Sequence, residues 1–142
     1  MPKTLSGFER QLCDIQGRLF ELSLKKDLDS EDFIKKFMNS KTCEFLDMPY
    51  DRLQWAGEEY ILENLLEETQ IKAVGVKYSK EVLFWSGFTY RYWHLLTGEN
   101  SVEVYKQADA KQMDECYLGF HALDVGMAIE DLKEIYRQKN NI

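Results

Sequence analysis

Proline and long apolar runs are the two features that this 142-residue sequence most clearly lacks. Only Pro2 and Pro49 occur, and their scarcity favours a mostly helical chain, because proline lacks a backbone N–H and clashes with the preceding helical turn. No stretch approaches the ~20 apolar residues of a membrane-spanning helix, and the first residues lack the apolar core of a signal peptide. We therefore expect one all-α domain over residues 1–142, located in the cytoplasm and without a membrane partner.

Residues that commonly carry chemistry are also few. The three cysteines are widely separated and odd in number, which predicts reduced thiols in a reducing compartment. His94 and His121 are the only histidines. No Cys-x-x-Cys pair, phosphate-binding glycine loop or Gly-x-Ser-x-Gly elbow occurs. The sequence therefore predicts no catalytic residue, no metal site and no cofactor.

Basic residues are almost missing from one segment. Residues 44–70 contain eight acids and one base, Arg52, so their charge of −8 + 1 = −7 equals the formal net charge of the whole chain. The acids are Glu44, Asp47, Asp51, Glu58, Glu59, Glu63, Glu67 and Glu68. A field of this sign repels nucleic acids and attracts basic partners. We expect no direct nucleic-acid binding and a protein partner with a basic surface.

Apolar residues recur at helical spacing along most of the chain. Positions three and four apart predict a long first helix over residues 4–26. Asp51 is expected to open a further helix whose apolar face includes Trp55 and Leu66. Residues 71–78 are read as a loop rather than a strand, since a lone strand would have no partner. Most of the remaining chain is predicted to be helical as well.

Residues that begin and end helices punctuate the second half of the chain. Ser79, Asn100, Asp109 and Asp124 are expected to cap the starts of helices with their side chains. Gly98 occupies the position where glycine commonly ends a helix. The short intervals between these signals predict a single compact bundle of about six to seven helices joined by short turns.

Residues 84–94 form the most aromatic part of the sequence. A helix that is apolar on most sides is usually central and buried, and this interpretation is favoured. The alternative is that one stripe of this helix reaches a partner, because Tyr, Trp and Arg carry much of the binding energy at interfaces. The residues predicted to bind a partner are Trp85, Tyr90, Arg91, His94, Glu58, Glu59, Glu63 and Glu67.

Three functional hypotheses follow from these patterns. The first is an acidic protein-binding module, not an enzyme, that binds and neutralises or assists a basic protein. The alternative is a small enzyme or ligand-binding domain with a pocket near Tyr90, Arg91, His94 and His121. The third is a homodimer in which an exposed aromatic stripe meets its own copy.

Several segments together resemble a family of small helical proteins of Gram-positive bacteria, encoded in toxin–antitoxin-like or mobile-element neighbourhoods. The segments that carry the resemblance are Gln11–Leu24, Leu53–Tyr60, Tyr90–Ala108, Tyr117–Asp124 and Ala128–Lys139. The resemblance implies an antitoxin or a similar accessory protein whose partner is a toxin. It supplies no catalytic motif and no residue roles.

Overall fold

The computed structural model describes residues 4–141 of the chain. In this range the protein is all-helical, which confirms the predicted fold class. It has eight α-helices and one 3₁₀ helix, rather than about six to seven helices, because the seven-residue segment Lys41–Asp47 is a complete helix of its own. The elements are α1 (Gly7–Lys25), α2 (Ser30–Met38), α3 (Lys41–Asp47), the 3₁₀ helix η1 (Arg52–Trp55), α4 (Glu58–Glu68), α5 (Lys80–Thr97), α6 (Ser101–Gln107), α7 (Ala110–Phe120) and α8 (Val125–Lys139). None of the helices within residues 4–141 combines the length and apolarity that a bilayer span needs.

Side-chain caps start several helices where the sequence predicted them. The side chains of Ser79, Asn100 and Asp109 each accept a hydrogen bond from a backbone N–H three residues further on, at the starts of α5, α6 and α7. The Asp124 side chain caps α8 in a similar way. Gly98 follows α5 with a φ of 80°, a left-handed conformation that glycine adopts readily.

The helix expected after Asp51 is instead two separate elements. Asp51 caps only η1, by accepting a hydrogen bond from the backbone N–H of Leu53. The chain then turns at Gly57, whose φ is 83°, before α4 begins. Because of this break, Trp55 leaves the predicted apolar stripe and is 70% exposed. Leu66 lies within α4 but off its buried side, and it is 43% exposed. The buried side of α4 consists of Ile61, Leu62 and Leu65.

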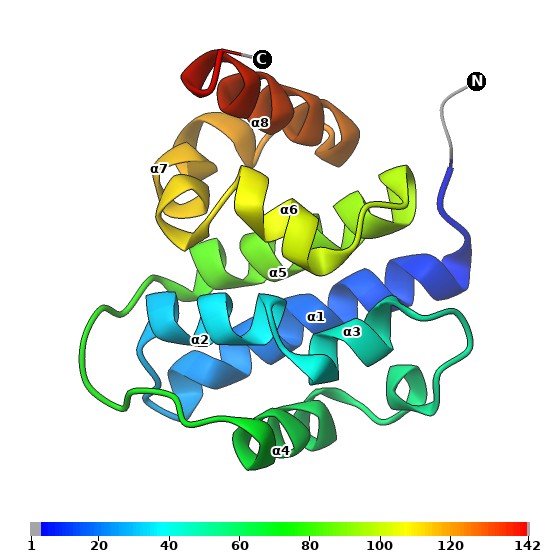
Figure 1. Cartoon of the computed structure of the whole chain (residues 1–142), viewed down its shortest axis with the longest axis vertical. Helices are drawn as coiled ribbons and strands as arrows, with labels where there is room; N and C mark the ends of the chain where they lie inside the picture. The colour runs from blue at the N-terminus through cyan, green and yellow to red at the C-terminus, as the bar shows by residue number, and fades with distance from the viewer. Residues whose placement is uncertain (1–3, 142) are drawn as a thin grey trace.

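Helices α1 and α5 share the most extensive helix–helix contact and cross the centre of the molecule (Figure 1). Their backbones approach closely at Gly87, where an added Cβ would lie 2.5 Å from the backbone oxygen of Gln16. The Gln16 side chain also donates a hydrogen bond to the Gly87 carbonyl at 3.0 Å. Helices α6, α7 and α8 also pack on α5, and Tyr90 and Trp93 are fully buried. The most aromatic helix is therefore central, as its composition favoured.

The loop between α4 and α5 contains no strand, in agreement with the interpretation of residues 71–78. It is held against the start of α2 by Asp29. The backbone N–H of Asp29 donates to the Lys72 carbonyl at 2.7 Å, and its carboxylate accepts from the backbone N–H of Val76 at 2.7 Å. The loop backbone is therefore hydrogen-bonded to the start of α2, and not to a neighbouring strand as in a β-sheet.

Candidate functional site

Arg91 lies in a buried polar network between α1, α3 and α5, and it is only 2% exposed. Its Nη1 donates to Oδ1 of Asp47 at 2.6 Å, and its Nε donates to Oε1 of Gln16 at 2.9 Å. Its Nη2 lies 3.5 Å from Sγ of Cys43. Burial by itself lowers the pKa of Arg91, but Cys43 and Asp47 outweigh this effect and raise it. Arg91 is therefore a charged side chain whose partners all lie inside the fold.

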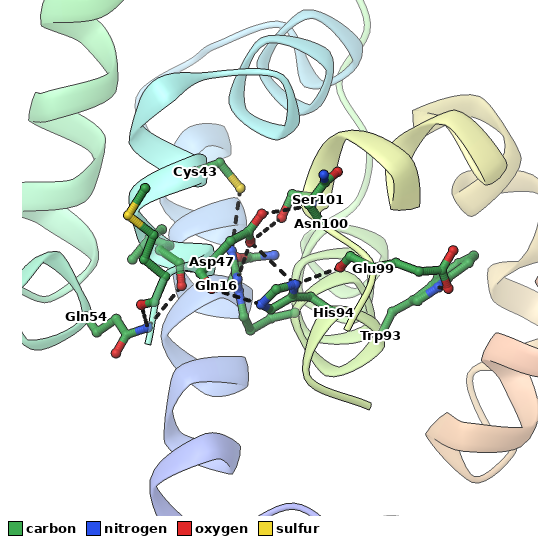
Figure 2. Close-up of polar contacts among 12 residues, drawn as sticks. Gln16, Cys43, Asp47, Gln54, Trp93, His94, Glu99, Asn100 and Ser101 are labelled. Carbon is green, nitrogen blue, oxygen red and sulfur yellow. Dashed lines mark hydrogen bonds and ion pairs between the residues drawn. The ribbon is translucent and has the colours of Figure 1, made fainter. Parts of the chain in front are cut away.

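Asp47, the last residue of α3, joins this network to α6 (Figure 2). Its Oδ2 accepts from the backbone N–H of Ser101 at 2.8 Å, and its Oδ1 accepts from the Ser101 hydroxyl at 2.7 Å. Both carboxylate oxygens are thus hydrogen-bonded in addition to the ion pair with Arg91. Removing one partner of such a buried pair typically costs about 3–5 kcal/mol, because the other charge is left uncompensated. The network therefore links four helices, α1, α3, α5 and α6.

His94 is engaged in the same region and is 14% exposed at its side chain. Its Nδ1 lies 2.7 Å from the backbone oxygen of Glu99, and its Nε2 lies 3.2 Å from the backbone oxygen of Asp47 (Figure 2). A neutral imidazole has one N–H, so both contacts are hydrogen bonds together only when the ring is protonated. Both ring nitrogens lie within hydrogen-bonding distance of backbone oxygens, so the ring is held by the fold.

The buried thiols do not supply a nucleophile. Burial raises the pKa of Cys13 to about 12 and that of Cys43 to about 11. Thiols with such pKa values stay protonated near neutral pH, and the protonated form reacts poorly. Within residues 4–141, no three His, Cys, Asp or Glu side chains are grouped so that they could hold a metal ion.

The predicted partner-binding stripe on α5 requires a correction. Tyr90 is fully buried, and its hydroxyl donates to the backbone oxygen of Ala108 at 2.6 Å. Arg91 is bound inside the network described above. Both side chains face inward because α5 is enclosed by its neighbours, so neither presents a surface to a partner. Trp85 is partly buried and packs edge-to-face against Tyr117, with ring centroids 5.8 Å apart.

The residues of the alternative enzyme pocket are not brought together. His121 is exposed at the end of α7 and stacks on Tyr117, with ring centroids 4.3 Å apart. His94 and His121 line two different hollows, and neither Tyr90 nor Arg91 lines either of them. A pocket near these four residues therefore lacks the shared space that a ligand would need.

No protein-family model, no curated protein and no solved structure matches the chain. The strongest candidate surface lies over the acidic residues 44–70.

Half of the eight carboxylates in residues 44–70 have partners within the protein. These are Asp47, Asp51, Glu58 and Glu68. Glu58, one of the predicted partner-binding residues, pairs with Arg18 at 3.1 Å. Glu68 accepts hydrogen bonds from the backbone N–H groups of Lys41 and Thr42 at 2.7 and 3.0 Å, at the start of α3. Partial burial opposes these bonds, but they leave the pKa of Glu68 lowered.

The other four carboxylates, Glu44, Glu59, Glu63 and Glu67, face solvent. In the part of the chain that the structure describes, none of the four forms a hydrogen bond or ion pair. Glu59, Glu63 and Glu67 repeat every four residues, which places them in one row along α4. The negative field of this segment therefore projects chiefly from α4.

Large apolar side chains are exposed in the same segment. Six of them fall between residues 45 and 66: Phe45, Met48, Tyr50, Trp55, Tyr60 and Leu66. The exposed valines, Leu118 and Met127 lie elsewhere in the sequence. Single exposed apolar residues are ordinary on protein surfaces, whereas a concentration of them commonly marks an interaction site.

A hollow of about 500 Å³ lies between α3, η1 and α4. It is lined by Phe45, Asp51, Arg52, Leu53, Ala56, Tyr60 and Asn64. Helical spacing places Glu63 one turn and Glu67 two turns beyond Tyr60 on the same side of α4. We call the hollow and these two glutamates the α3–α4 face. Phe45 and Tyr60 were not predicted as site residues, because aromatic residues at helical spacing are more often buried, and only their acidic neighbours gave a signal.

Proposed function

We propose that this protein is an acidic protein-binding module that docks a basic protein partner on its α3–α4 face. The observation that carries the proposal is that two exposed aromatic side chains, Phe45 and Tyr60, line a hollow in the same segment, residues 44–67, that holds the four unpaired glutamates. An apolar anchor beside exposed charged groups is a combination typical of a binding surface. This placement replaces the α5 stripe as the source of the anchor.

The two components of the face have different roles in the proposal. The walls of the hollow, Phe45 and Tyr60, are 43% and 55% exposed, and a partner that covered them would remove apolar area from water. Glu59, Glu63 and Glu67 would attract a basic surface from a distance and speed the encounter. Glu58 contributes less, because Arg18 already neutralises it.

The finer part of the proposal is that the partner is a toxin-like protein whose basic working surface is covered on binding. A surface that binds nucleic acids or nucleotides is rich in Lys and Arg, and is the kind of surface that this field attracts. The resemblance to proteins of toxin–antitoxin-like neighbourhoods supports the same interpretation. If the partner arrests growth when expressed alone, co-expression of this chain should restore growth. Arrest that persists in the presence of the bound chain would limit the proposal to a binding role.

The test is affinity capture from native cells at low salt, with quantitative mass spectrometry of the proteins that co-elute. We expect a basic partner that is released by salt and is lost from Tyr60→Ala and from Glu63→Lys/Glu67→Lys. The matched control is Glu115→Lys/Glu130→Lys, which makes the same charge change at two exposed positions on α7 and α8. Capture that is unaffected by both variants of the α3–α4 face would refute the proposal.

A homodimer is the competing use of an exposed apolar face. Sedimentation velocity of the purified protein distinguishes the two. A monomer supports a separate partner, whereas a dimer that Tyr60→Ala dissociates would mean that the face binds its own copy.

A further inference from the structure

We infer that the segment received by the α3–α4 face is a basic amphipathic helix with one large apolar anchor. This inference rests on the proposed function and specifies the form of the partner. Three features of the face lead to it: the lining of the hollow, the unequal distribution of charge around it, and the helical backbone of the elements that form it.

The hollow is suited to a single bulky anchor. Its volume of about 500 Å³ is at the lower end of the range for ligand pockets. Its apolar lining comes from all three elements: Phe45 from α3, Leu53 and Ala56 from or beside η1, and Tyr60 from α4. Two of these side chains are aromatic and partly exposed, which favours contact with a leucine-, methionine- or phenylalanine-sized group.

The charges around the hollow are not distributed evenly. On the α4 side, Glu63 and Glu67 follow Tyr60 by one and two turns and have no partner. On the η1 side, Asp51 and exposed Arg52 both line the hollow, so their charges offset each other. A cation next to the anchor is therefore attracted more strongly on the α4 side than on the η1 side. The face should select a segment with Lys or Arg to one side of its apolar residue, and a neutral or acidic residue to the other.

The backbone of the face determines the conformation of the occupant. Extended peptides often bind by pairing their main chain with the free edge of a sheet. The face consists of α3, η1 and α4, and residues 4–141 contain no strand whose free edge could pair with an extended peptide. A helix satisfies its own backbone and needs only side-chain contacts from its partner. The 11 residues of α4 span about 16 Å, so a partner helix lying alongside could contact it over about three turns.

The inference is tested with a synthetic, covalently stapled helical peptide, because short free helices are only marginally stable in water. The peptide carries one Leu, Lys one and two turns after it, and Glu one turn before it. The first comparison peptide replaces both Lys by Gln. The second has the same composition but carries a central Pro, no staple and therefore no helix. Binding is followed by calorimetry and by backbone amide NMR shifts of the full chain.

We expect the stapled peptide to bind and to shift amide signals of α3, η1 and α4. Loss of both Lys should weaken binding about tenfold at low salt, which is about 1.4 kcal/mol for two exposed ion pairs. With Glu63→Gln/Glu67→Gln, the Lys peptide and the Gln peptide should bind about equally well. With the control Glu115→Gln/Glu130→Gln, the Lys peptide should still bind more tightly than the Gln peptide. Tyr60→Ala should weaken both helical peptides, because the anchor loses a wall of the hollow.

Two results would overturn the inference directly. If the Pro-containing peptide binds as tightly as the helical one, the occupant is not a helix. If the Gln peptide binds as tightly as the Lys peptide, the partner is not selected by charge. Failure of all peptides, while cellular capture still depends on Tyr60, would reject the helix and leave the proposed function standing. Failure of both assays would reject the function as well.

Discussion

Glu99, in the turn between α5 and α6, links three helices through its carboxylate, and its replacement by glutamine should lower stability in a pH-dependent way. Its Oε1 accepts from Nζ of Lys133 at 2.6 Å and from Nε1 of Trp93 at 3.1 Å, and its Oε2 accepts from Nε2 of Gln107 at 2.5 Å. These donors come from α8, α5 and α6. Glu99→Gln keeps the shape of the side chain but removes the charge that the donors require.

The size of the effect follows from the pKa of Glu99. Partial burial acts to raise this pKa, but the hydrogen bonds to the carboxylate outweigh it and lower the pKa from 4.5 to about 2. A difference of this size corresponds to about 3 kcal/mol if it is fully expressed in stability. The side chain is 26% exposed, and solvent screening reduces the expected loss to about 1–2 kcal/mol at neutral pH.

The pH dependence has a definite sign. Because the pKa of Glu99 is lower in the folded than in the unfolded protein, the unfolded chain binds more protons between about pH 2 and 4.5. The stabilisation is therefore fully present above pH 4.5 and is lost as the pH falls towards 2. The difference in the free energy of unfolding between wild type and Glu99→Gln should fall by about half by roughly pH 3.

Urea unfolding followed by circular dichroism, repeated from neutral pH to about pH 3, measures this difference. The control is Glu103→Gln, at an exposed position of α6 where the side chain forms no hydrogen bond or ion pair within residues 4–141. It should change stability little at any pH. A Glu99→Gln effect that is the same at neutral and acidic pH would refute the reasoning, because the loss would then come from packing and not from charge.

Three further predictions concern the interior. Gly87→Ala should lower the free energy of unfolding by about 1–3 kcal/mol, because its Cβ would meet a backbone oxygen. Gly119→Ala should raise the free energy of unfolding by about 0.5 kcal/mol, because nothing lies within 4 Å of its added Cβ. Thermal unfolding measures both variants, and equal effects would contradict the close approach of α1 and α5. Arg91→Met should lower the free energy of unfolding in urea by about 3 kcal/mol, because it leaves the Asp47 carboxylate buried without its partner. Adding Asp47→Asn should recover part of this loss, and no recovery would mean that the unpaired Asp47 charge is not its cause. Iodoacetamide should modify Cys116 first in the native protein, since the other two cysteines are buried, and mass spectrometry showing uniform labelling would contradict this order.

Much of the fold could be predicted because the signals that determine it are local. Ser79, Asn100 and Asp109 cap helices through hydrogen bonds to residues three positions away. Such contacts form within a single turn and depend little on the rest of the molecule. The predicted extent of the helix after Asp51 was wrong, because its apolar spacing gave no sign of the break at Gly57.

The candidate site was predicted only in part, because burial is a property of the assembled bundle. The row of Glu59, Glu63 and Glu67 could be placed on the surface from its spacing alone. The exposure of Phe45 and Tyr60 could not, since an aromatic residue at helical spacing packs inward whenever another helix covers it. No local pattern indicated that α3, η1 and α4 would leave a hollow between them.

The sequence by itself determined the helical class, most helix boundaries and the sign of the surface charge, all of which depend on residue type and short spacings. Only the tertiary structure decided which individual polar side chains are buried and which are exposed. Arg91 and Asp47 are 44 residues apart. Arg91, predicted as an interface residue, is instead buried because the fold brings it into an ion pair with Asp47. Residues that look alike in sequence therefore differ in role, because the packing of distant helices decides which of them water can reach.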